Sequence, residues 1–126
     1  MISCRPVLLA CAVAALLVPA AAHPQTVVNA TFNTAYVFET VDSYEVKGWP
    51  NRVVVTGLQV GASDPTTISF PYYTSNATST ETARSFERCD RFALIAMNKP
   101  GQFLLEVRTE GSSSSFPFVA CKLTRR

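Results

Sequence analysis

The hydrophobic period of this chain changes once, and that change limits the folds that it can adopt. Between Thr31 and Tyr73, β-branched and aromatic residues recur in short runs separated by Gly, Pro and Asn, which is typical of strands. Over residues 79–98, apolar residues recur at spacings of three and four, which predicts one long helix. The strand pattern returns after the breaking sequence at residues 99–101. We therefore expect a β-rich α+β domain with a single helix.

Five segments have the composition of strands and are separated by turn signals. Gly57, inside the second segment, predicts a bulge or a sharp bend. Residues 23–29 are expected to form an irregular start, and residues 125–126 to fray. The predicted strands span residues 31–41 with an extension over 44–47, then 52–60, 66–73, 102–108 and 116–124.

The helix predicted over residues 79–98 is amphipathic. Thr78, followed by Glu81 three residues later, forms the pattern of a capping box at its start. The basic side of the helix also carries acidic residues, so we interpret it as a solvated, self-paired face. The buried stripe is expected to consist of Phe86, Cys89, Ala93, Ala96 and Met97.

The first 22 residues have the pattern of a secretory signal peptide. Arg5 precedes an apolar run over residues 7–18, Pro19 ends that run, and residues 20–22 are small, as cleavage requires. The run has 12 residues, fewer than the ~20 that a helix needs to span a membrane, so a cleaved signal is favoured over an anchor. We expect residues 23–126 to form one domain in a secreted or periplasmic protein, without a membrane span.

Cys89 and Cys121 are the two cysteines that follow the predicted signal. An even pair of cysteines in an exported protein predicts a disulfide. Two cysteines cannot form a four-ligand zinc site, and no histidine lies near them in the sequence. A redox-active pair is disfavoured because the chain has no C-x-x-C pattern.

The expected order of elements is β-β-β-α-β-β, with the helix between the third and fourth strands. Over residues 34–124 this order resembles that of the OB-fold, a five-stranded Greek-key barrel. Small secreted proteins with this order include the receptor-binding B subunits of bacterial AB5 toxins. The resemblance implies an antiparallel barrel capped by the helix, in which Cys89 can reach Cys121 in the final strand. An open antiparallel sheet packed on one helix is the alternative that the same order permits.

The residue patterns that catalysis usually requires are missing from the sequence. His23 is the one histidine, no G-x-S-x-G occurs, and no Ser precedes a Lys by three residues. Glu39, Asp42 and Glu45 lie on strand-like sequence, which fits a solvated face better than a calcium site. A net charge of +2 gives little affinity for nucleic acid through counterion release. We expect no enzymatic activity, no metal, no cofactor and no nucleic-acid partner.

Two aromatic clusters at expected turns have the composition of ligand contacts, because they combine flat rings with hydrogen-bonding side chains. In an OB-like topology, the Ser-rich loop over residues 112–115 would lie beside the mouth of the barrel. We therefore expect a small exported binding or structural protein whose ligand is an unidentified glycan or protein surface. The alternative is a secreted enzyme inhibitor that presents a loop from a disulfide-braced scaffold. The candidate ligand-contacting residues are Trp49, Asn51, Tyr72, Tyr73, Ser113 and Ser114.

Overall fold

A computed structural model describes residues 26–73, 79–111 and 117–126, within which the chain forms seven strands and one helix. The predicted signal peptide, Thr78, Ser113 and Ser114 lie outside this description, as do the side chains of residues 79–82, and with them the capping box of Thr78 and Glu81. Within it, no helix combines the length and hydropathy of a membrane span. In chain order the elements are β1 (Val27–Asn29), β2 (Tyr36–Phe38), β3 (Ser43–Gly48), β4 (Asn51–Gly57), β5 (Thr66–Pro71), α1 (Ser79–Asn98), β6 (Phe103–Glu110) and β7 (Phe118–Arg125).

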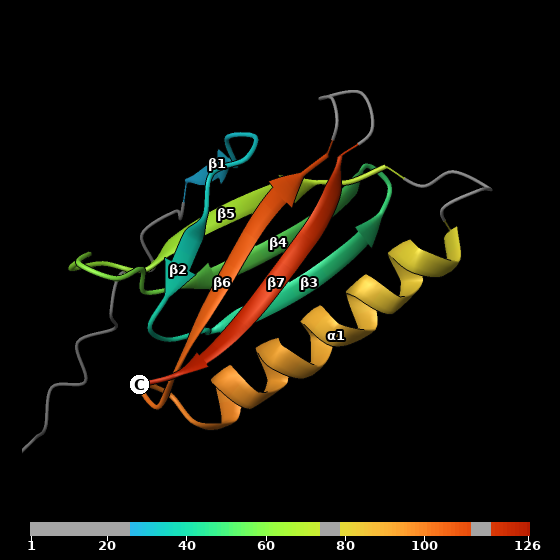
Figure 1. Ribbon diagram of the computed structural model, residues 1–126. Coiled ribbons are helices and arrows are strands. Elements are labelled where there is room, and N and C mark those ends of the chain that lie inside the picture. Colours follow the sequence, from blue (N-terminus) through green and yellow to red (C-terminus); the bar gives the residue numbers. More distant parts are fainter. Residues whose placement is uncertain (1–25, 74–78, 112–116) are drawn as a thin grey trace, which may run out of the picture.

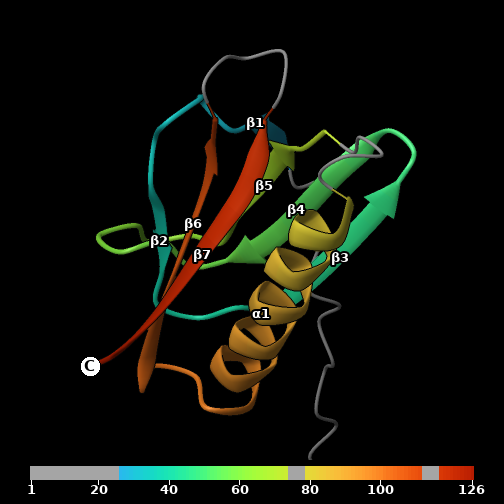
Figure 2. The ribbon, with the colours of Figure 1, turned by 45° about the vertical axis from the view of Figure 1, so that its right-hand side comes forward.

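The strands form two sheets that face each other (Figure 1). The larger sheet has the order β1-β5-β4-β3 and is antiparallel except for β1, which pairs in parallel with β5. The smaller sheet has the order β2-β6-β7 and is antiparallel throughout. The helix α1 lies beside β7 and β3, which are edge strands of the two sheets (Figure 2). It therefore covers the opening between the sheets on that side.

The hydrophobic core lies between the two sheets and α1. Alternate residues of β4 and β6 point into it, as the two-residue period of a strand predicts. The predicted helix stripe is confirmed for Cys89, Ala93 and Ala96, which are buried, whereas Met97 is exposed. The largest fully buried side chains are Phe38, Phe70, Leu105, Val53, Val55, Val107 and Val119.

The closed OB-like barrel that the order of elements implied is not formed by the described strands. Closing a barrel requires every strand to be paired along both edges. Here β1 occupies the outer edge of β5, and α1 rather than a strand lies between β7 and β3. The coarser expectation, a strand-rich domain packed on one helix, is confirmed, in the form of two sheets and α1.

Residues 27–29 and 125–126 are more regular than the sequence predicted. Residues 27–29 form β1, in which Val27 lies opposite Thr67 of β5. At the other end, Arg125 belongs to β7, and the backbone N–H of Arg126 donates to the carbonyl oxygen of Gln102 at 3.0 Å. The guanidinium of Arg126 also lies 3.0 Å from the carboxylate of Glu39. For residues 27–29 and 125–126 the expectation of irregular structure was wrong, because these contacts join segments that are far apart in the sequence, whereas residues 23–25 lie outside the described residues.

The two sheets are joined where β4 ends at Gly57, the residue predicted to mark a bend. Beyond it, the carbonyl oxygen of Leu58 accepts a hydrogen bond from the N–H of Glu39 at 2.7 Å, and the N–H of Val60 donates to Val37 at 2.9 Å. The chain therefore leaves the larger sheet here and pairs with residues in and next to β2. Gly57 is therefore the last residue of β4, regularly paired with Thr66, rather than a bulge or bend inside a strand over residues 52–60.

The predicted disulfide between Cys89 and Cys121 is present. It joins the buried face of α1 to β7, with the two Cα atoms 5.4 Å apart. The bonded residues are separated by 32 positions in the sequence. The bond thus fixes the helix over the opening between the two sheets.

Candidate functional site

Segments that are distant in the sequence meet at one end of the two sheets (Figure 1). Asn51, directly after the turn between β3 and β4, accepts a hydrogen bond from the backbone N–H of Tyr72 at 3.2 Å. The N–H of Tyr73 donates in turn to the carbonyl oxygen of Pro117, just before β7, at 2.7 Å. The structure therefore brings the turn that carries Trp49 to the same end as Asn51, Tyr72 and Tyr73.

Trp49 forms the tip of the hairpin between β3 and β4. Gly48 and Asn51 are paired across the hairpin, which leaves Trp49 and Pro50 as the two turn residues, joined by a cis peptide bond. The indole side chain is 91% exposed, more than any other large hydrophobic side chain in the described part of the chain. An indole in this position presents a large apolar surface and an N–H donor to whatever approaches the turn.

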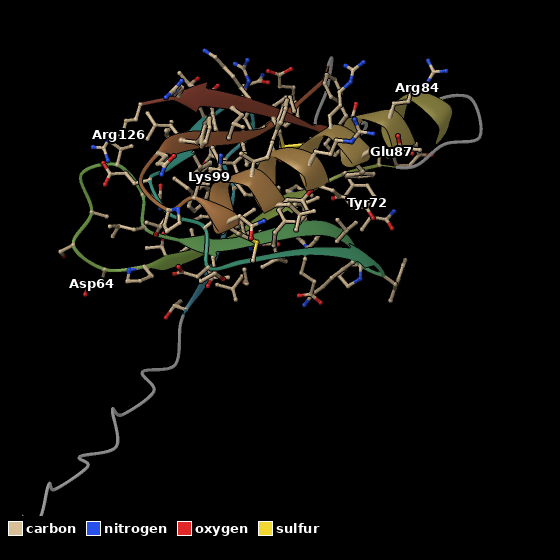
Figure 3. All side chains as sticks on the ribbon, turned by 90° about the horizontal axis from the view of Figure 1, so that it is seen from below. Asp64, Tyr72, Arg84, Glu87, Lys99 and Arg126 are labelled. Carbon is tan, nitrogen blue, oxygen red and sulfur yellow. A yellow bond between two sulfur atoms is a disulfide. The ribbon has the colours of Figure 1, made fainter. Side chains whose placement is uncertain are left out.

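Tyr72 is buried beneath this end rather than presented on it. Its hydroxyl donates to the backbone carbonyl of Lys47 at 2.8 Å, and its ring packs edge-to-face on Phe86 with the centroids 4.4 Å apart. Burial raises the pKa of the Tyr72 hydroxyl above its usual range. The residue lies between the larger sheet and α1 (Figure 3). Because its contacts are internal, we assign Tyr72 to the framework of the site and not to its surface.

Tyr73 and Phe118 are exposed at the same end, with 41% and 43% of their surface accessible. Sequence reasoning did not select Phe118, although the alternation along β7 contained the signal. Val119 is buried in the core, so the residue before it must point outward. Trp49, Tyr73 and Phe118 are the exposed large aromatic side chains among the described residues, and we call them the aromatic end.

A shallow pocket of about 150 Å³ lies between α1 and the start of β7, next to the aromatic end. Its lining includes Ser85 and Arg88 of α1 together with Phe118. It offers one cation, one hydroxyl and one aromatic ring, which can bind an acidic or amide group but do not form a nucleophile–base arrangement. Among the side chains that the structure describes, no three of His, Cys, Asp or Glu are grouped to hold a metal ion.

The framework role of Tyr72 gives a stability prediction. Tyr72→Phe is expected to lower the free energy of unfolding by about 1 kcal/mol, because the variant loses the hydrogen bond to Lys47 and keeps the ring packing. Urea denaturation measures this change. Trp49→Ala is the control, and we expect it to change stability by less than about 0.5 kcal/mol because its side chain is exposed. Equal stability of Tyr72→Phe and the wild type would contradict the role of this hydroxyl.

Comparison with known proteins identifies no relative of this chain. No protein family, curated protein or solved structure matches it. The function proposed below therefore depends on the geometry and chemistry of the residues themselves.

Proposed function

We propose that this protein is a small non-enzymatic binding protein that contacts a partner protein through its aromatic end. The observation that carries this proposal is the 91% exposure of Trp49 at the tip of a hairpin. Trp, Tyr and Arg dominate the binding energy of protein interfaces more often than other residues do. Trp49, Tyr73 and the neighbouring Arg88 supply these three types.

The geometry favours a protein over a glycan as the partner. A sugar ring is bound most effectively when an aromatic face is flanked by hydrogen-bonding side chains that together form a concave site. Trp49 projects from its turn with almost all of its surface accessible, so little protein surrounds the indole to form such a site. A projecting indole instead suits insertion into a pocket on a partner.

The same hairpin tip supports a second candidate function, an inhibitor that inserts this turn into an enzyme cleft.

Hydrogen bonds and a disulfide brace the segments beneath the aromatic end, which supports the proposal. The hydrogen bonds of Asn51, Tyr72 and Tyr73 tie three segments together, and the Cys89–Cys121 disulfide fixes α1 against β7. A preorganised surface loses little conformational entropy on binding. Because structural disulfides are typical of oxidising compartments, we propose that the partner is an extracellular or periplasmic protein.

Trp49→Ala is expected to weaken binding to the partner by about 30-fold, the effect of losing a hot spot worth about 2 kcal/mol. Exported proteins of the source cells are cross-linked to the wild type, to Trp49→Ala and to the control Val60→Ala, and the products are quantified by mass spectrometry. Val60 is exposed beyond the opposite end of β4, so its variant should bind like the wild type. The dissociation constants for the partner so identified are then measured by calorimetry.

Two results would contradict the proposal. A partner protein that binds Trp49→Ala as tightly as the wild type would remove the aromatic end from the interface. The second result is that a glycan binds in a way that depends on Trp49 while no protein does. The partner would then be a carbohydrate and not a protein. An enzyme whose activity falls on binding would select the inhibitor function.

A further inference from the structure

A second concave surface lies away from the aromatic end, between β3 and α1, which run side by side (Figure 2). It is a groove of about 400 Å³, within the range of pockets that bind small molecules. Apolar side chains make up most of its walls, and Leu94 and Met97 are partly accessible there although both are large and hydrophobic. The lining residues are Tyr44, Val46, Asp90, Ala93, Leu94 and Met97.

The groove contains two polar groups with incomplete hydrogen bonding. The hydroxyl oxygen of Tyr44 and the Oδ1 atom of Asp90 are buried, and neither has a hydrogen-bond partner among the described residues. The Tyr44 hydroxyl lies beside the Asp90 carboxylate and interacts with it, but the contact lacks the geometry of a full hydrogen bond. Burial, followed by the nearby Asp90 carboxylate, raises the pKa of the Tyr44 hydroxyl well above its usual range. Buried polar atoms without partners are uncommon in proteins, so the pair calls for an explanation.

Among the described residues, no cationic side chain lies within ion-pair distance of the Asp90 carboxylate. The ion pairs of the described residues involve other carboxylates, and Lys47 is paired with Glu45. Glu45 and Lys47 alternate with Tyr44 and Val46 along β3, so they lie on the opposite face of the strand. Asp90 is half-buried and lines the groove, although its Oδ1 atom is covered.

We propose that this groove binds a small amphiphilic amine, with its ammonium group at Asp90 and Tyr44 and its apolar group against Val46, Leu94 and Met97. The ammonium supplies a cation for the Asp90 carboxylate, and the Tyr44 ring adds a favourable surface for a positive charge. The apolar walls strengthen the ion pair because they exclude water. This site uses none of the residues of the aromatic end, so it goes beyond the proposed function and stands or fails separately.

Three probes of similar size test the site: 2-phenylethylamine, 2-phenylethanol and 3-phenylpropionate. Titrations followed by the NMR signals of the Met97 methyl group and of the amides of residues 90–97 report binding. We expect saturable binding of the amine, at least tenfold weaker binding of the alcohol, and no detectable binding of the carboxylate. Asp90→Asn should weaken amine binding at least tenfold, because the change removes the negative charge. The dissociation constants of the amine and the alcohol should then agree to within about twofold.

Matched variants separate this site from general effects. Glu87→Gln removes an exposed carboxylate from the same helix, one turn away, and should leave the amine affinity unchanged. Trp49→Ala should also leave it unchanged, which distinguishes a failure here from a failure at the aromatic end. If Asp90→Asn does not fold, Tyr44→Phe replaces it, and a several-fold loss of amine affinity is expected.

Three outcomes would overturn the proposal. Equal binding of the three probes would show a purely apolar groove without charge selectivity. Signal changes that occur outside the groove would place the amine elsewhere. A crystal structure soaked with the amine that shows only a water molecule bridging Tyr44 and Asp90 would show that solvent completes this pair.

Discussion

Replacing Cys89 and Cys121 together by alanine is expected to lower the free energy of unfolding by about 3.7 kcal/mol. The disulfide restricts the unfolded chain, and in the chain-entropy model the effect grows with the 32-residue separation of the two cysteines. In the native state the bond joins α1 to β7, beside the opening that α1 covers. Its loss should therefore also loosen the contact between the helix and the smaller sheet.

Guanidinium denaturation of the double-alanine variant and of the wild type measures this loss. The wild type denatured in the presence of reductant is the matched control, because it breaks the same bond without changing the side-chain volume of the core. Both samples should lose comparable stability. A loss below about 1 kcal/mol in both would show that the bond contributes little to the stability of this fold.

Gly57→Ala is expected to destabilise the protein by about 3 kcal/mol, at the upper end of overpacking substitutions. An added Cβ atom would overlap the backbone carbonyl oxygen of Thr40 and lie 3.1 Å from the Cα atom of Val41. Backbone atoms cannot rotate away as a flexible side chain can. The substitution must therefore displace the segment before β3 or the end of β4, where the two sheets are joined.

Gly48→Ala is the control for this prediction. A Cβ atom at Gly48 meets nothing within 4 Å, so we expect a change of less than about 0.5 kcal/mol. Thermal unfolding followed by circular dichroism compares the two variants with the wild type. Equal melting temperatures for Gly57→Ala and Gly48→Ala would contradict the tight packing at Gly57.

Features encoded by neighbouring residues were predicted well from the sequence. The helix was expected over residues 79–98, and α1 spans Ser79–Asn98. Its apolar spacing and the breaking residues after it determine both bounds locally. The disulfide followed from an even cysteine count together with a predicted signal. These inferences required no knowledge of how distant segments pair.

Features that depend on distant segments were not predicted. The three residues of β1 carry no distinctive pattern, and their strand conformation arises from pairing with β5. The barrel closure that the order of elements implied is absent, since β1 occupies the outer edge of β5 and α1 lies between β7 and β3. The expected strand over 31–41 is reduced to Tyr36–Phe38, because β2 pairs only with the residues of β6 opposite it. Order alone does not determine which edges meet.

The groove between β3 and α1 was missed although one signal was visible. Asp90 lies four residues after Phe86 and three before Ala93, so helical spacing places a charged residue on the apolar stripe. From the sequence alone, Asp90 was instead placed among the acidic residues that balance the charge on the basic face of the helix. Tyr44 contributes from a different element, and only the fold brings the two together.

The C-terminal residue lies at the end of β7 that is farthest from the aromatic end. Arg125 is paired with Phe103 at one end of the smaller sheet, whereas Phe118 is paired with Glu110 at the other. Figure 3 shows Arg126 on the opposite side of the domain from Tyr72. Arg126 is anchored there by Gln102 and Glu39. A tag or tether attached after Arg126 would therefore hold the protein on a sensor chip or bead by the end opposite the tryptophan-bearing tip, which leaves that tip accessible to a partner in solution.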